Sequence, residues 1–199
     1  GARCDVESRQ YSYSFSEELQ QEWDWSERYA PQPEILKYAN HVADRFGLRP
    51  DIQFSTTVER ADFNESSNLW LVVTSGGKTV TAKFVVLATG CLSNARMPEI
   101  KGLDRFEGKV YHTGHWPHET VAFTGLRVGV IGPGSSVIQS VPVIAEQASE
   151  LTVFQRTANF SIPARNAMLT EQERQAFRAK YPEVRHFARV VSRNGIYTE

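Results

Sequence analysis

The sequence predicts an α/β fold, which three patterns in different parts of the chain indicate. Residues 34–46 carry apolar side chains at helical spacing, residues 52–88 contain three short β-rich runs, and residues 126–154 read as strand, glycine loop, helix and strand. The last pattern is a βαβ unit, in which the strands are parallel and the crossover is almost always right-handed. We therefore expect two folding units, the first built on a helix with a β-meander and the second on the βαβ unit.

The N-terminal part predicts one extended segment and two helices. Aromatic and serine side chains alternate over residues 11–15, which is typical of an extended segment, and Ser16 precedes residues suited to a short helix. Residues 34–46 predict an amphipathic helix, and Gly47 stands at the usual position of a helix C-cap.

The β-rich part predicts a meander. Its three expected strands are residues 52–58, 69–74 and 80–88. Gly76 and Gly77 separate the last two strands and suit a tight turn. Because residues 84–88 are continuously apolar, we expect a strand that is buried on both faces and ends at Thr89-Gly90.

The second half predicts a connector, the βαβ unit and a helical tail. Residues 91–124 are interrupted by prolines and glycines, which is typical of a connector between two folding units. The expected elements that follow are a strand at 126–131, a loop at 132–136, a helix at 138–148, a strand at 151–154 and a charged helix at 169–188.

The composition is that of a globular protein and excludes several classes. With 41% hydrophobic and 23% charged residues, disorder is not expected, and no apolar run approaches the roughly 18 to 20 residues that cross a bilayer. The net charge of -1 lacks the basic excess that binding to nucleic acid requires. Cys4 and Cys91 lie far apart, which suits two unpaired thiols in a reducing compartment. We expect a cytoplasmic protein with neither membrane nor nucleic acid as a partner.

The glycine loop is the first candidate site. A loop between a strand and a helix presents backbone N–H groups and the positive end of the helix dipole, where a pyrophosphate can bind. Gly132 and Gly134 match the fingerprint G-x-G-x-x-G, but Val137 replaces the third glycine and Pro133 has no N–H to donate. A plain turn is the alternative for this loop.

The end of the following strand favours NADP over NAD. Arg156 lies 156 − 132 = 24 residues after Gly132, near the position where an acidic residue would bind the ribose 2′-hydroxyl of NAD. An Arg there can pair with the 2′-phosphate of NADP, and Thr157 adds a hydroxyl donor. A solvated surface Arg is the alternative.

The connector carries an unusual cluster between Phe106 and His118. Its three histidines are His112, His115 and His118, but Gly114 and Pro117 break the helix that would align them, and no Cys or paired carboxylate completes a zinc site. As an alternative to any chemical role, His112 and Trp116 would pack between two domains.

Ser136 does not match a hydrolase nucleophile. An esterase elbow needs Gly-x-Ser-x-Gly, and Ile138 stands where the second glycine should be.

Together these residues resemble the flavin-dependent Baeyer–Villiger monooxygenases. The fingerprint of that family, Phe-x-Gly-x-x-x-His-x-x-x-Trp followed by Pro or Asp, is matched by Phe106, Gly108, His112, Trp116 and Pro117. The resemblance extends over nearly the whole chain to about residue 166. Its further segments are residues 1–5, 11–15, 31–46, 88–90 and 128–163.

The resemblance implies a Rossmann-like flavoprotein with two dinucleotide-binding domains. Residues 1–98 would be part of the FAD domain, 99–124 the fingerprint linker and 125–199 part of the NADP domain with a helical tail. It also implies that FAD reacts with NADPH and O2 to give a flavin peroxide, which inserts one oxygen into a small-molecule ketone to yield an ester or lactone.

The resemblance further implies roles for single residues. Asp5 would support catalysis beside the flavin and the nicotinamide, and His112 would couple domain movement to the flavin rather than transfer protons. The implied cofactor-binding residues are Arg3, Cys4, Asp5, Tyr11 and Val58 for FAD, and Gly132, Gly134, Ser135, Ser136, Arg156 and Thr157 for NADP.

The chain also departs from the family pattern. The first glycine fingerprint of the family would precede Gly1 and its active-site Arg would follow Glu199, so we expect an internal fragment that is inactive alone. Val137 would widen the gap between helix and strand and weaken NADP binding. Two other functions stay open, a related amine or sulfide monooxygenase and a non-catalytic NADP-binding module.

Overall fold

A computed structural model describes residues 2–192, which fall into two compact units. The outer unit consists of Gly1–Gly47 and Ala122–Glu199, and the middle unit is Leu48–Val121. The chain therefore leaves the outer unit once and returns to it. In the described residues no helix is long and apolar enough to cross a membrane.

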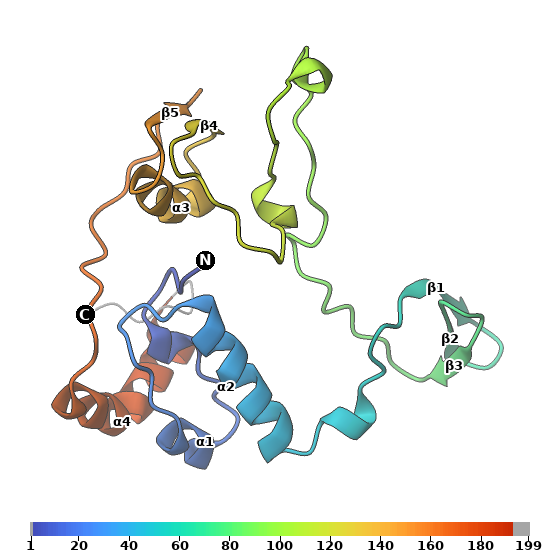
Figure 1. Cartoon of the computed structure of the whole chain (residues 1–199). Coiled ribbons are helices and arrows are strands. Elements are labelled where there is room, and N and C mark those ends of the chain that lie inside the picture. Colours follow the sequence, from blue (N-terminus) through green and yellow to red (C-terminus); the bar gives the residue numbers. More distant parts are fainter. Residues whose placement is uncertain (1, 193–199) are drawn as a thin grey trace. The chain divides into compact units, whose positions relative to one another are not determined.

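Three helices and the segments between them form the core of the outer unit. These are α1 (Glu17–Glu22), α2 (Gln32–Arg45) and α4 (Glu171–His186), with α1 in contact with α4 (Figure 1). The buried cluster consists of Cys4, Leu19, Trp25, Ala30, Tyr38, Val42 and Leu169. Residues from both ends of the chain thus share one hydrophobic core.

Local capping explains where these helices begin and end. Ser16 Oγ accepts a hydrogen bond from Leu19 N at the start of α1, as its place in the sequence predicts. Thr170 and Glu173 form a capping box at the start of α4. Gly47, with a φ of +62°, follows α2 in the left-handed conformation, so the predicted stop is confirmed.

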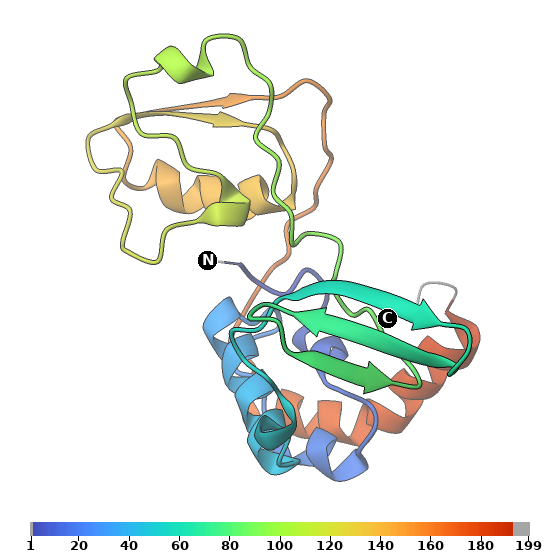
Figure 2. The ribbon, with the colours of Figure 1, turned by 90° about the vertical axis from the view of Figure 1, so that its right-hand side faces the viewer.

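The βαβ unit has the predicted topology. β4 (Arg127–Ile131) and β5 (Glu150–Phe154) pair in parallel, and α3 (Ser135–Ala145) connects them. Figure 2 shows α3 against one face of the two strands. Both strands and the crossover helix are confirmed, with α3 beginning three residues earlier than the apolar spacing predicts.

The middle unit contains the predicted meander. β1 (Val58–Asn64), β2 (Leu69–Thr74) and β3 (Thr79–Ala82) form an antiparallel sheet in that order (Figure 2). The Gly76-Gly77 turn is confirmed: both residues have positive φ, +88° and +77°, which is the conformation that such a tight hairpin requires.

The first strand of the meander is displaced from its predicted position. Residues 52–57 are not a strand, and β1 runs on to Asn64. The turn that follows β1 sets this register: Asn64 Oδ1 accepts from Ser67 N at 3.0 Å, and Phe63 pairs with Trp70 across the hairpin. The sequence pattern missed this part of β1 because three of its residues are charged (Glu59, Arg60 and Asp62).

The prediction of a buried strand at residues 84–88 is wrong. β3 ends at Ala82, and Phe84, Val86 and Leu87 are 78%, 86% and 75% exposed. A strand buried on both faces needs neighbouring strands and a covering layer, and among the described residues none pairs with this run.

The extended segment predicted at residues 11–15 is also corrected. A 3-10 turn, Ser8–Tyr11, opens this part of the chain, and the residues after it pair with no strand. Tyr13 N donates to Tyr38 Oη at 2.8 Å, and the ring of Tyr13 lies 5.7 Å from that of Phe15. The rings of Tyr13 and Phe15 therefore pack against one another, and the ring of Tyr13 also stacks on Tyr38 of α2.

Candidate functional site

The glycine loop is short and tied to the neighbouring strand. Only three residues separate β4 from α3, and Gly132 has a φ of +99°, a conformation that other residues rarely adopt. Gly132 N donates to Phe154 O at 2.8 Å, which joins the loop to the end of β5. A Cβ added to Gly134 would meet nothing within 4 Å, so open space lies beside the loop at that residue.

The first turn of α3 offers hydrogen-bond donors to an anion. No side chain caps this helix, and Val137 N and Ile138 N both donate to Gly134 O. The N–H groups before them have no carbonyl one turn earlier, and Ser135 and Ser136 are exposed. This donor set and the open space fit a pyrophosphate at the helix N-terminus.

Pro133 and Val137, the two departures from the fingerprint, are accommodated. Pro133 supplies an acceptor, because Asn159 Nδ2 donates to its carbonyl oxygen at 2.9 Å. Val137 is half-buried, and α3 still contacts β5 with Val137 in place of the glycine.

Arg156 and Thr157 lie beside this loop. Both side chains are exposed. They come two and three residues after Phe154, and the carbonyl oxygen of Phe154 accepts the hydrogen bond from Gly132 N. Asn159 returns to the loop two residues later. The structure therefore brings the predicted 2′-phosphate residues and the predicted pyrophosphate loop to one end of the βαβ unit.

Asp5 and Tyr11 form a hydrogen-bonded pair. Tyr11 Oη donates to Asp5 Oδ1 at 2.6 Å. Burial, and after it the hydrogen bond to Asp5, raises the pKa of Tyr11 to about 12. The Tyr11 hydroxyl is therefore protonated at neutral pH and remains a donor to the Asp5 carboxylate.

Arg3 and Cys4 are held by the segment before α2. Cys4 N donates to Ala30 O at 2.9 Å, and the Cys4 side chain is 4% exposed within the core cluster. Burial raises the pKa of the Cys4 thiol. Arg3 Nη1 donates to Glu27 Oε2 at 2.6 Å and to Tyr29 O at 3.1 Å.

The sequence reasoning missed three residues around Arg3. Gln139 Oε1 accepts from Arg3 N at 2.8 Å, and Asn166 Nδ2 shares Glu27 Oε2 with Arg3 at 2.5 Å. The sequence does carry a signal for Gln139, because it lies four residues, or one helical turn, after Ser135. Glu27 and Asn166 carry no local signal, since their separation in sequence is 139 residues.

His112 and Val58 belong to the middle unit. His112 is half-buried, and its Nδ1 accepts from Gly114 N at 3.0 Å, which caps the 3-10 turn Thr113–His115. Val58 begins β1 opposite Thr74 and is 56% exposed. The remaining predicted site residues lie in the outer unit.

Gly108 of the fingerprint, and Gly114 between His112 and Trp116, are close-packed. A Cβ on Gly108 would lie 2.5 Å from Cε1 of Phe106, and one on Gly114 would lie 2.9 Å from Cβ of Ala95. The rings of Tyr111 and Trp116 lie 5.7 Å apart. The residues of the fingerprint thus pack closely against their neighbours in the chain.

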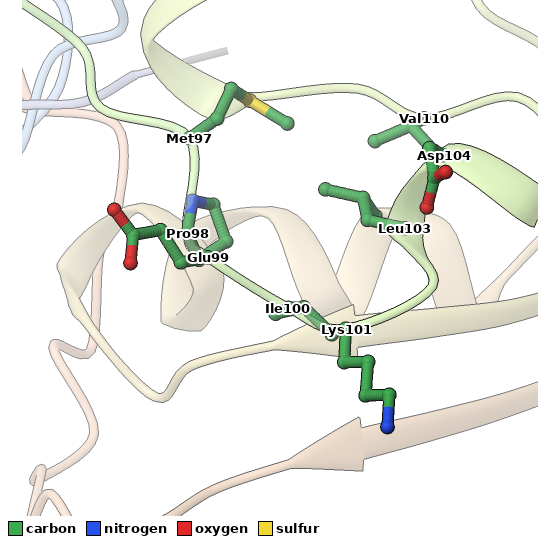
Figure 3. Close-up of a pocket in the computed structure, with 8 residues that line it drawn as sticks. All are labelled: Met97, Pro98, Glu99, Ile100, Lys101, Leu103, Asp104 and Val110. Atoms are coloured by element: carbon green, nitrogen blue, oxygen red, sulfur yellow. The ribbon is translucent and has the colours of Figure 1, made fainter.

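One open hollow of about 690 Å³ lies in the middle unit. Figure 3 shows the side chains of Met97 and Leu103 turned toward one another and that of Lys101 turned away. No predicted site residue is among its lining residues, which are Met97, Pro98, Glu99, Ile100, Lys101, Leu103, Asp104 and Val110. Within residues 2–192, no three His, Cys, Asp or Glu side chains are grouped as metal ligands.

Comparison with known proteins connects this geometry to a family. Residues 9–180 match the family described as pyridine nucleotide-disulphide oxidoreductase. A Baeyer-Villiger monooxygenase from Pseudooceanicola batsensis is 47% identical over 166 residues, which are 83% of this chain and 30% of that protein. A phenazine N-monooxygenase from Lysobacter antibioticus is 45% identical over 171 residues, 86% of this chain and 31% of that protein.

Solved structures of similar proteins have the same fold. An oxidized steroid monooxygenase bound to NADP is 59% identical, with a TM-score of 0.87 over 95% of this chain and 36% of that one. A complex of OTEMO with FAD and NADP is 41% identical, with a TM-score of 0.86 over 95% of this chain and 36% of that one. The chain therefore spans about a third of the length of the proteins it matches.

Proposed function

The chain belongs to the pyridine nucleotide-disulphide oxidoreductase family. From this premise we propose that it is part of an FAD- and NADPH-dependent Baeyer–Villiger monooxygenase. The reaction inserts one atom of O2 into a ketone to give an ester or lactone. The observation that carries this proposal is the complete fingerprint from Phe106 to Pro117, in a chain 47% identical to a protein named a Baeyer-Villiger monooxygenase.

NADP is the nucleotide proposed for the βαβ unit. The N–H groups at Gly134, Ser135 and Ser136 would hold the pyrophosphate, with the two serine hydroxyls as additional donors. Arg156 and Thr157 would bind the 2′-phosphate, since no acidic residue follows β5 to repel it. The similar steroid monooxygenase structure is bound to NADP, which supports this assignment.

FAD is the cofactor proposed for the N-terminal segment. Bound FAD would supply the redox chemistry, with NADPH as the reductant and O2 as the oxidant. Asp5 would present a carboxylate that Tyr11 orients through the 2.6 Å hydrogen bond. Arg3, Cys4 and Val58 would line the site, Cys4 through its backbone because its side chain is in the core.

The domain assignment follows the cofactors. Residues 1–98 are proposed as part of the FAD domain, 99–124 as the fingerprint linker and 125–199 as part of the NADP domain. His112 would act in the linker by holding its turn, which suits a hinge that closes over bound nucleotide and excludes water. The two unpaired cysteines support a cytoplasmic location.

Heteroatom oxygenation is the second candidate function. The relative named phenazine N-monooxygenase is nearly as similar as the Baeyer-Villiger one, 45% against 47% identity. The two functions share FAD, NADPH and O2 and differ in the atom that receives the oxygen.

Product analysis under 18O2 tests the proposal. The natural gene product that contains these residues is supplied with NADPH and, in separate reactions, with a cyclic ketone, a thioether and an aromatic N-heterocycle. We expect a lactone carrying one labelled oxygen from the ketone. A labelled sulfoxide or N-oxide without any lactone would instead establish the second function, and binding of NADP without any product would indicate a non-catalytic module.

A further inference from the structure

Arg3 joins three parts of the outer unit that are far apart in sequence. Its backbone N–H donates to Gln139 on α3, and its guanidinium donates to Glu27 and to Tyr29 O. Asn166 donates to the same Glu27 oxygen at 2.5 Å and accepts from Tyr29 N at 2.9 Å. We call Arg3, Glu27, Gln139 and Asn166 the Arg3 junction.

The junction places the Asp5 segment next to the helix that carries the glycine loop. Gln139 is four residues after Ser135, so it lies on the same helix face about 6 Å further along the axis. Asp5 is two residues after Arg3, about 7 Å away in an extended chain. The Gln139–Arg3 hydrogen bond is thus a short connection between the proposed nucleotide loop and the Asp5–Tyr11 pair.

Glu27 and Asn166 fix the other side of Arg3. Glu27 is held by its backbone, since its carbonyl accepts from Ser8 Oγ at 2.8 Å and it bridges to Met168. The Glu27 side chain is 19% exposed and that of Arg3 43%, so the ion pair is partly shielded from solvent. The guanidinium is therefore anchored, and the Arg3 N–H is available to Gln139.

We propose that Gln139 is a positioning residue that couples nucleotide binding at the glycine loop to the segment Arg3–Asp5. A pyrophosphate bound at the start of α3 orders the first turn, and with it the acceptor of the Arg3 hydrogen bond one turn later. Thermodynamic linkage makes this effect reciprocal. The factor by which bound nucleotide favours the ordered Arg3–Asp5 segment is also the factor by which the ordered segment raises the affinity for nucleotide. The inference rests on the proposed function, because it takes NADP as the ligand of the loop.

Residue-resolved amide exchange in the natural gene product that contains these residues, the original chain of this comparison, tests the coupling. Gln139→Met keeps the length of the side chain and removes the acceptor, whereas Gln139→Glu keeps an acceptor. In the absence of nucleotide we expect the Arg3 amide to exchange about fivefold faster in Gln139→Met, the effect of one lost hydrogen bond. Saturating NADP should slow exchange at residues 3–5 in the original chain and in Gln139→Glu, but not in Gln139→Met.

Gln147→Met is the matched control. Gln147 lies just beyond α3, and its Oε1 likewise accepts from a backbone N–H, that of Phe123, at 3.1 Å. This variant should keep the NADP effect at residues 3–5. Circular dichroism of each variant verifies that the helices are retained.

The outcomes separate the coupling from the proposed function. NADP binding by calorimetry, together with equal slowing of residues 3–5 in Gln139→Met and the original chain, would overturn the coupling and leave the proposed function standing. If the natural gene product that contains these residues does not bind NADP, both are overturned.

Discussion

At the scale of single residues, the two ends of the proposed NADP site differ in how firmly they are held. Gly132 and Asn159 are hydrogen-bonded into the loop, at 2.8 Å and 2.9 Å. Arg156 and Thr157 are exposed beyond the end of β5. The loop is thus held by hydrogen bonds, whereas the residues proposed for the 2′-phosphate lie at the surface.

Replacing Arg156 by Ala should weaken binding of NADP about tenfold and leave that of NAD unchanged. The reason is that only NADP carries the 2′-phosphate, and a charge-assisted hydrogen bond contributes about 1.5 to 3 kcal/mol, at the lower end for an exposed group. Calorimetric titration with each nucleotide measures the difference. Arg127→Ala, at the opposite end of the parallel strands, is the control. An equal loss for both nucleotides would contradict the assignment.

The Asp5–Tyr11 pair predicts a pH dependence at high pH. The folded-state pKa of Tyr11 is about 12 against an ordinary 10.0, so its contribution to stability is fully present below pH 10 and is lost as pH rises from 10 to 12. Burial also raises the pKa of Tyr38 and of Tyr181, so titration of tyrosinate absorbance should show several late-ionising groups, with one fewer in Tyr11→Phe. Asp5→Asn should lower the midpoint of Tyr11 only in part, because burial is the larger cause. The same number of late-ionising groups in both chains would refute the pairing.

At the scale of elements, the βαβ unit was predictable and the β-meander only in part. β4, α3 and β5 have a local pattern: two short apolar runs, glycines and a helical spacing between them. β1 has three charged residues on an exposed hairpin, and its register depends on a turn at Asn64–Asn68 that hydrophobic spacing does not reveal. The run 84–88 failed as a strand because pairing depends on other strands, not on its own residues.

The two glycines of the loop provide a matched pair of substitutions. Gly132 has a φ of +99° and Gly134 a φ of -71°, and neither has an atom within 4 Å of an added Cβ. Gly132→Ala should lower the free energy of unfolding by about 1 kcal/mol, and Gly134→Ala should change it by less than about 0.5 kcal/mol. Gly134→Ala should instead weaken NADP binding about tenfold, because its methyl group occupies the space proposed for the pyrophosphate.

Denaturant unfolding and calorimetry measure these two effects separately. If Gly134→Ala bound NADP as tightly as the original chain, the pyrophosphate could not lie against that residue. If Gly132→Ala were as stable as the original chain, the positive φ would not be a requirement of the loop.

At the scale of the whole molecule, the candidate site draws on residues that sequence reasoning could identify only one at a time. Motif spacing indicated Gly132 and Arg156, and the resemblance to a family added Asp5, Tyr11 and His112. The Arg3 junction was not predictable, because hydrogen bonds between residues 3, 27, 139 and 166 arise only when the chain has folded.

Exposed apolar residues should limit the solubility of the 199-residue chain. Phe84, Val86, Leu87 and Leu92 are between 75% and 88% exposed within nine residues, which is typical of a surface that associates. Val86→Lys should therefore raise the concentration at which the chain self-associates, measured by light scattering. Leu36→Lys adds the same charge at a 54% exposed site on α2 and should have a smaller effect. Equal effects would attribute the change to net charge alone.

The two-segment make-up of the outer unit has a consequence for synthesis on the ribosome. The core that holds Cys4, Leu19 and Tyr38 also contains Leu169, so it stays incomplete until 169 − 47 = 122 further residues follow Gly47. At about 5 to 20 residues per second this takes about 6 to 24 s. The middle unit, whose hairpins pair residues close in sequence, can complete its sheet during that interval. Cys4, Leu19 and Tyr38, although translated before the middle unit, are therefore buried in a complete core only after it.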